Sequence, residues 1–319
     1  MLDGGGKKAP AALHEATAYN TADEAIQAYK LAAKTLGGCA VAGSYIESGR
    51  TVDGVGNEAT GVVVVDVSKS RAHSVVLNRT GRVMNIIDVS QPSKALAMTA
   101  VAKALGQVNS VQCRPAGGEC NGNASADDGP PPMGGDEAGF LATGDLPPAR
   151  AKIGPWVPTE IAPPKAKFRG SQCETVDWAT VQAKSKSWRT YLYTASGSGF
   201  VGLDEIVLTT KDAKAANKLV DKIKSDLTSC KRPRVLTASV TKPDKVSSVG
   251  AQKTEIAGWT AVVSQKLTDG RTAKYRVGIV AAGPKVIYTF LNPKGDYDVT
   301  SDQWDTVAVR AGERATQVP

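Results

Sequence analysis

Most nucleophilic catalysis depends on a histidine base, and this chain has only two histidines, His14 and His73. His14 lies near the amino end, and His73 alternates with apolar residues in a predicted strand. The sequence contains no His-Glu-x-x-His, Gly-x-Ser-x-Gly or phosphate-binding Gly-x-x-x-x-Gly-Lys pattern. We therefore predict no catalytic residue and no enzyme activity.

Five cysteines are present: Cys39, Cys113, Cys120, Cys173 and Cys230. Zinc sites need closely spaced cysteine or histidine pairs, so we predict no metal site and no cofactor. Cys113 and Cys120 flank a turn-rich loop that suits a local bridge. Cys173 precedes a predicted hairpin and Cys230 ends a predicted helix. A bridge between these two would hold the helix on the sheet, with a chain-entropy effect of about 4 kcal/mol.

The cysteines leave two compartments open. Five reduced thiols would fit a cytosolic protein, whereas two bridges imply an oxidising, extracytoplasmic setting. In the bridged interpretation, Cys39 is free or pairs with a cysteine upstream of Met1. No apolar run approaches the roughly 20 residues of a membrane span, and the first residues have no signal-peptide core. We expect any membrane attachment to come from a segment absent from this chain.

Two groups of side chains are candidate binding surfaces. The first is a possible ligand groove of Trp188, Tyr191 and Tyr193, although aromatic clusters more often serve packing. The second is a possible anion-binding face of Lys211, Lys214, Lys218 and Lys222, which alternatively is a solvated helix face. Nucleic-acid binders usually interleave aromatic residues with such lysines or present a reading motif, so no nucleic acid is expected.

Charge divides the chain into unequal halves. The net charge is +8, from 39 Lys+Arg and 31 Asp+Glu. Residues 1–150 hold 13 basic and 15 acidic residues, which leaves 26 and 16 for residues 151–319. A basic second half is compatible with an anionic partner or with an ordinary solvated surface.

Hydrophobic spacing predicts the same order of elements in both halves: a helix ending at a cysteine, three strands and a closing helix. The predicted helices are 22–36, 93–108, 211–230 and 301–314. The predicted strands are 61–67, 72–77, 82–89, 189–194, 203–209, 256–267, 273–281 and 285–291. Cys39 and Cys230 stand at equivalent places. An accidental match of common elements remains the alternative to a true repeat.

The prolines predict a boundary between the halves. Ten of the 17 prolines lie between Pro115 and Pro164, where long helix or central strand is disfavoured. We predict an α+β fold with two similar modules, each a small antiparallel sheet packed with two helices, joined by a Pro-rich linker. The boundaries are 1–113 for a first, amino-terminally truncated module, 114–170 for the linker and 171–319 for the second module.

The second half also resembles a known family. Cys173, the helix ending at Cys230, Trp259, the strand 275–280 and the closing segment 309–314 resemble the extracytoplasmic PknH-like sensor modules of actinobacteria. They are equally similar to the carboxy-terminal regions of SigE-type extracytoplasmic-function sigma factors. The resemblance implies a disulfide-bonded α+β sensing or ligand-binding domain without catalysis.

These observations predict a non-enzymatic, extracytoplasmic sensor or ligand-binding protein with tandem modules. Its expected partner is a small molecule, a cell-envelope polymer or a protein. The alternative is the regulatory tail of a sigma factor, which would act in the cytoplasm by protein contact.

Overall fold

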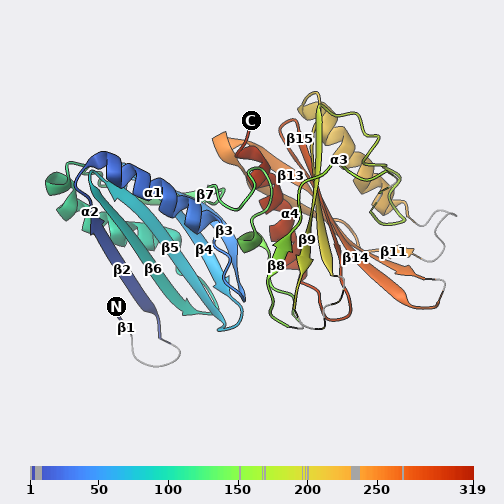
Figure 1. Cartoon of the computed structure of the whole chain (residues 1–319), viewed down its shortest axis with the longest axis horizontal. Coiled ribbons are helices and arrows are strands. Elements are labelled where there is room, and N and C mark those ends of the chain that lie inside the picture. Colours follow the sequence, from blue (N-terminus) through green and yellow to red (C-terminus); the bar gives the residue numbers. More distant parts are fainter. Residues whose placement is uncertain are drawn as a thin grey trace. The chain divides into compact units, whose positions relative to one another are not determined.

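The computed structural model describes residues 2–3, 9–150, 152–166, 168, 170–195, 197, 199, 201–230, 238–267 and 269–319. These residues form two antiparallel sheets and four α-helices, so the predicted α+β class is confirmed (Figure 1). The chain divides into two compact units. Unit 1 comprises Met1–Glu137 with Gly144–Pro147, and unit 2 comprises Ala138–Thr143 with Pro148–Pro319.

The sheet of unit 1 has the strand order β1-β2-β6-β5-β4-β3-β7. Its strands are β1 (Leu2–Asp3), β2 (Ala11–Ala18), β3 (Ser44–Asp53), β4 (Glu58–Asp66), β5 (Arg71–Thr80), β6 (Val83–Pro92) and β7 (Ser125–Gly129). The strands β1, β2, β3 and β7 were not predicted. β2 is short of large apolar residues, and its pairing with β6 holds it in the sheet.

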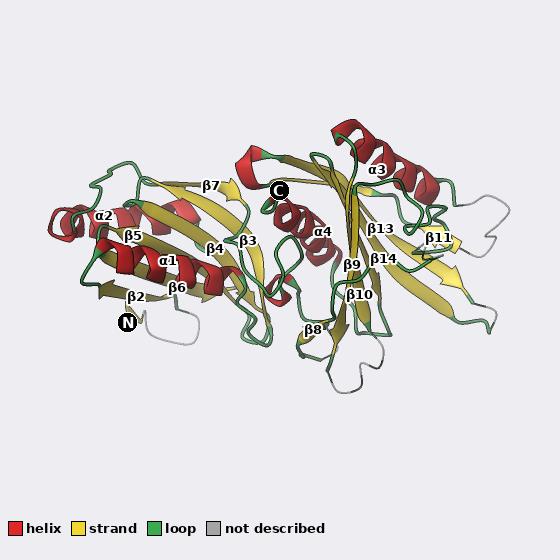
Figure 2. Cartoon of the chain, turned by 45° about the horizontal axis from the view of Figure 1, so that its top comes forward, coloured by secondary structure: helices red, strands yellow, loops and turns green. Residues whose placement is uncertain are grey.

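The helices α1 (Ala22–Gly37) and α2 (Met98–Ala116) cover opposite faces of this sheet (Figure 2). Successive strand residues point to opposite faces. On β5, Val75 therefore packs in the cluster that includes Leu36 of α1, and Val76 packs in the cluster that includes Leu105 of α2. Both faces are buried, which is why β4 and β5 contain nearly continuous apolar runs.

The boundaries of α2 differ from the predicted 93–108. β6 continues to Pro92, and Ser93 has φ 65°, so the predicted first residue of the helix lies in a left-handed turn. At its other end α2 continues through Cys113 to Ala116. It stops at Gly117, whose φ of 71° is the left-handed conformation that glycine adopts readily after a helix.

The sheet of unit 2 has the order β11-β13-β14-β15-β10-β9-β8, with β12 paired to β13. Its strands are β8 (Trp156–Pro158), β9 (Ser185–Tyr193), β10 (Gly202–Thr209), β11 (Ala238–Val240), β12 (Asp244–Val249), β13 (Glu255–Lys266), β14 (Thr272–Ala282) and β15 (Lys285–Asn292). The five strands predicted in this half correspond to β9, β10, β13, β14 and β15 and are confirmed.

The helices α3 (Ala213–Thr228) and α4 (Ser301–Thr316) pack on opposite faces of the unit 2 sheet. Val220 and Ile223 of α3 lie in the apolar cluster with Ile279 of β14. On the other face, a Cβ at Gly278 would lie 2.9 Å from the Cβ of Ala308 on α4. Glycine at this position therefore lets α4 approach the sheet closely.

The proline-rich segment 114–170 contributes to both sheets. It contains β7 of unit 1 and β8 of unit 2. Phe140, Leu141 and Leu146 are buried, at 6%, 0% and 2% exposure. Within the described residues, the segment is therefore partly packed rather than extended throughout. No helix among those residues has the length and apolarity needed to cross a membrane.

Candidate ligand site

A groove with a volume of about 550 Å³ lies in unit 1 between α2 and the segment that leads into β7. Its lining residues are Lys103, Gly106, Gln107, Ser110, Asn121, Gly122, Asn123, Ala124 and Ser125. The volume is within the range of about 300–1,000 Å³ that is usual for small-molecule sites. We define these residues as the polar groove.

Helical spacing explains one wall of the polar groove. Positions 103, 106, 107 and 110 are three, four and seven residues apart, so they form one stripe along α2. The adjacent stripe, which includes Leu105, Asn109 and Cys113, is buried against the sheet. Burial of that stripe fixes the rotation of α2 and turns the polar stripe towards the groove.

The opposite wall is a loop that the disulfide Cys113–Cys120 holds to the end of α2, with 5.1 Å between the two Cα atoms. The side chain of Asn109 donates a hydrogen bond to the main-chain oxygen of Glu119 at 3.1 Å. Thr80 Oγ1 of β5 lies 3.4 Å from the same oxygen. The loop is therefore fixed by one covalent bond and by hydrogen bonds from two elements.

Asn121 fixes the next part of the loop. Its Nδ2 atom donates to Gly56 O at 3.0 Å and to Glu119 Oε2 at 3.1 Å. Gly56 lies between β3 and β4, so this bond ties the groove wall to the central sheet. The Oδ1 atom of Asn121 accepts no hydrogen bond from the described residues, which leaves it as an acceptor beside the groove.

The lining offers hydrogen bonds but little charge. The ammonium group of Lys103 forms no ion pair with any described residue. Ser110 Oγ donates to Gln107 O at 2.7 Å and keeps its lone pairs as acceptors. Carboxylates, histidines and cysteines do not occur among the nine lining residues. The polar groove is suited to binding a polar ligand.

The structure does not bring the predicted aromatic groove together. Trp188, Tyr191 and Tyr193 are 8%, 0% and 2% exposed. Trp188 lies on the α3 face of β9 and stacks on Phe168 at 5.2 Å, whereas the two tyrosines point to the other face because they are odd-numbered positions of the strand. Tyr191 donates to Leu141 O at 2.7 Å. All three rings pack inside unit 2.

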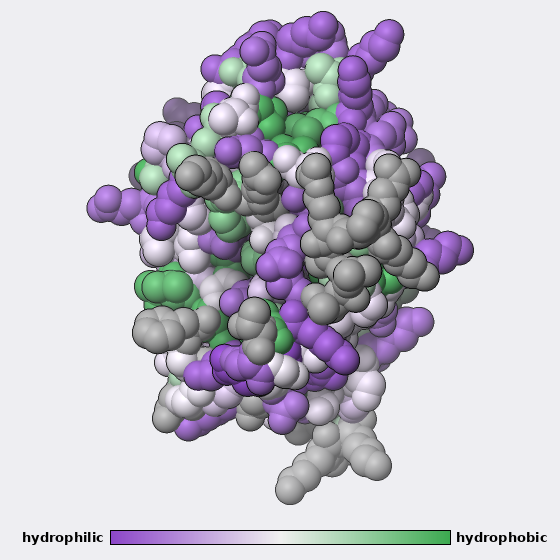
Figure 3. Space-filling model, turned by 90° about the vertical axis from the view of Figure 1, so that its right-hand side faces the viewer, coloured by the Kyte–Doolittle hydropathy of each residue, from purple (hydrophilic) through white to green (hydrophobic). Residues whose placement is uncertain are grey.

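Three lysines of the predicted face, Lys214, Lys218 and Lys222, lie on one exposed side of α3, and Lys211 precedes the helix cap Asp212. Lys211, Lys214, Lys218 and Lys222 are exposed, and in the upper part of Figure 3, where α3 lies, hydrophilic side chains surround a smaller apolar area. Lys222 forms an ion pair with Asp226 and donates to Thr175 Oγ1 at 2.5 Å. This lysine therefore also helps to hold the segment after Cys173 on α3.

Both predicted cysteine pairs are bonded. Cys173 and Cys230 form the second disulfide, with a Cα separation of 5.0 Å, and Cys39 is a free, exposed thiol. Such bridges are typical of proteins in oxidising compartments.

The two histidines lie on opposite faces of the unit 1 sheet. His73 Nδ1 is 3.0 Å from both carboxylate oxygens of Asp88, and His14 Nε2 is 3.2 Å from Asn85 Oδ1. Each ring therefore has a local partner on a neighbouring strand. Among the described residues, no group of three or more His, Cys, Asp or Glu side chains is arranged to hold a metal ion.

A buried carboxyl group in unit 2 was not predicted. Glu174, beside Cys173, is 3% exposed, and burial raises its pKa to about 7 against the opposing effect of hydrogen bonds to its oxygens. Ser171 donates to Glu174 Oε1 from its amide at 3.0 Å and from its hydroxyl at 2.7 Å. Sequence gives no sign of this burial, because the carboxyl group is enclosed by residues distant in sequence, such as Tyr288 of β15.

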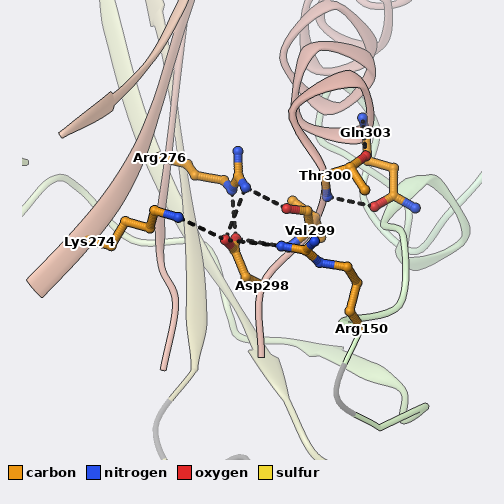
Figure 4. A network of polar contacts seen from close by, with 7 residues as sticks. All are labelled: Arg150, Lys274, Arg276, Asp298, Val299, Thr300 and Gln303. Carbon is orange, nitrogen blue, oxygen red and sulfur yellow. Dashed lines mark hydrogen bonds and ion pairs between the residues drawn. The ribbon is translucent and has the colours of Figure 1, made fainter. Parts of the chain in front are cut away.

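A second buried charge lies at the start of α4. Arg150, Lys274 and Arg276 converge on Asp298 from separate parts of unit 2 (Figure 4). Arg276 Nε is 2.6 Å from Asp298 Oδ1, and its Nη2 is 3.0 Å from Oδ2. Two residues later, Thr300 and Gln303 form a capping box. The network fixes the entry of the chain into α4.

No protein-family model and no curated protein matches this chain. Among solved structures, the crystal structure of DynU16, from the dynemicin biosynthetic locus, aligns with 97% of this chain and 94% of its own. The identity is 8% and the TM-score is 0.14, so this likeness supports no inference about fold or function.

Proposed function

We propose that this chain is a non-enzymatic, extracytoplasmic binding or sensor protein in which the polar groove holds the ligand. The observation that carries the proposal is the loop wall of the groove, which a disulfide and hydrogen bonds from α2 and β5 hold in place. A preformed wall lowers the ordering cost of binding. The resemblance of the second half to PknH-like sensor modules supports the same class of function.

The two units are proposed to be copies of one module. The strand orders β2-β6-β5-β4-β3 and β10-β15-β14-β13-β12 correspond, and in each unit one helix follows the first strand and another follows the last. A cysteine follows the first helix in both, at Cys39 and Cys230. The sequence between the units is proposed to act as the connection.

The extracytoplasmic location is tested by titrating thiols in the denatured, unreduced protein. The protein would be taken from its own cells, and its free thiols would be labelled at lysis with a maleimide and counted by mass. One free thiol, from Cys39, is expected. Five thiols would exclude this location and favour the alternative, a sigma-factor regulatory tail acting in the cytoplasm.

The ligand site is tested by ligand-observed NMR with glucose, glucuronic acid, glycine and adenosine as probes. We expect saturation transfer to at least one probe, and we expect its loss in Ser110→Trp, which places a large ring on the groove stripe. The matched control is Val111→Trp. Val111 is 77% exposed and lies outside the lining, so this variant should retain binding. Equal binding by both variants would remove the polar groove as the site.

A further inference from the structure

We propose that the polar groove recognises an acidic saccharide, through one carboxylate and several hydroxyl groups. This inference rests on the proposed function, because it names the ligand class of the same groove. It depends on how charge and hydrogen-bonding groups are distributed along the two walls.

The single formal charge of the lining lies towards one end of the groove. Lys103 and Ser110 are seven residues apart on α2, which corresponds to about 10 Å along the helix axis. Lys103 is exposed and has no carboxylate partner among the described residues. One unpaired ammonium group matches one carboxylate, whereas a phosphate-rich ligand would require several cations.

The remaining groups match hydroxyls. The side-chain amides of Gln107 and Asn123 each offer donors and an acceptor, and neither amide is hydrogen-bonded to another described residue. Ser110 Oγ and Asn121 Oδ1 add acceptors, because their donor hydrogens are already used within the protein. A sugar hydroxyl both donates and accepts hydrogen bonds. A row of hydroxyls can therefore pair with both the donors and the acceptors of the lining.

The lining disfavours other ligand classes. A metal cation or a polyamine would need carboxylates, and none line the groove. Gly122 leaves room beside the main chain, because a Cβ there would meet no atom within 4 Å, whereas a Cβ at Gly106 would lie 3.3 Å from the Cβ of Ala124.

The test compares affinities of the full chain for glucuronic acid, glucose and a hyaluronan hexasaccharide by calorimetry or NMR titration. Glucuronic acid should bind about tenfold more tightly than glucose, the difference expected for one charge-assisted hydrogen bond. Lys103→Met should remove this preference and leave glucose binding within about twofold. The control Lys30→Met changes an exposed lysine on α1, on the other face of the sheet, and should keep the preference. Tighter binding of the hexasaccharide than of glucuronic acid would identify a polymer as the ligand. Equal binding would identify a free sugar as the ligand.

The outcomes separate this inference from the proposed function. If adenosine or glycine bound and Ser110→Trp abolished that binding, the groove would remain the ligand site and the acidic-saccharide assignment would be wrong. The assignment would also be wrong if Lys103→Met left glucuronic acid binding unchanged. If Ser110→Trp and Val111→Trp bound every probe equally, both the groove and its ligand class would be overturned.

Discussion

The side chain of Asn109, on the buried face of α2, donates a hydrogen bond of 3.1 Å to the main-chain oxygen of Glu119 inside the disulfide loop. The side chain of Asn109 is completely buried whereas Glu119 is exposed, so the hydrogen bond is partly buried. The helix that forms one wall of the polar groove therefore holds the other wall directly.

Replacing Asn109 with leucine should lower the free energy of unfolding by about 1–2 kcal/mol, because leucine has the same number of side-chain heavy atoms but cannot donate the bond to Glu119 O. Urea denaturation followed by circular dichroism measures the change. Gln107→Leu is the control on the exposed stripe of the same helix and should leave stability unchanged. Equal effects of the two substitutions would show that the Asn109 bond does not hold the loop.

The two disulfides should differ in their effect on stability. The chain-entropy model gives about 2.5 kcal/mol for the loop closed by Cys113–Cys120, with a sequence separation of 7, and about 4 kcal/mol for Cys173–Cys230, with a separation of 57. Paired Cys→Ala variants, compared by denaturant unfolding, test this order. Cys39→Ala is the control, since that thiol is free. The reverse order would mean that the stabilisation by each disulfide depends mainly on local strain or on residual structure of the unfolded chain, and not on loop length.

Glu174 should make stability depend on pH. Its pKa in the folded protein is raised from 4.5 to about 7, so the folded state holds this proton more tightly than the unfolded state does. Its contribution is therefore fully present below about pH 4.5 and is lost as the pH rises to about 7, by about 3 kcal/mol in total. Glu174→Gln should remove this component, so that the stability of the wild type relative to the variant falls across that window.

Unfolding curves at pH 4.5, 6 and 8 measure the effect of Glu174. Glu160→Gln, at an exposed position, is the control and should keep the wild-type pH dependence. A pH-independent difference between wild type and Glu174→Gln would contradict the raised pKa.

Asp298→Asn should be strongly destabilising, by about 3–5 kcal/mol, because Arg276 would keep its buried charge without a carboxylate partner. Both side chains are buried, at 3% and 4% exposure. Thermal unfolding provides the measurement. The control Asp269→Asn removes a carboxylate from an exposed pair with Arg271 and should cause no measurable change. Similar melting temperatures for both variants would rule out a structural role of the Asp298 network.

The helices of the second half could be predicted closely from spacing. The apolar stripe that includes Val220 and Ile223 predicted α3 within two residues at each end, because a helix with one buried face has a clear periodic pattern. The start of α2 was predicted too early, because the pairing of β6 with β5 extends the strand to Pro92 and α2 begins only at Met98.

The spacing of the aromatic residues in the sequence already argued against a shared groove. Trp188 and Tyr191 are an odd number of positions apart on one strand, so period-two alternation places them on opposite faces. The odd spacing by itself places the ring of Trp188 on the opposite face of the sheet from the ring of Tyr191. Their burial, in contrast, depends on segments such as the one containing Leu141, which are distant in sequence.

The sequence by itself determined the α+β class, the main helices and strands, and the pairing of four cysteines, because each of these depends on local periodicity or on the position of a residue next to a regular element. Tertiary structure alone decided the polar groove, the burial of Glu174 and the network around Asp298. These features bring together residues from separate elements, such as Asn121 and Gly56, and no local pattern encodes how the chain folds back to place them in contact.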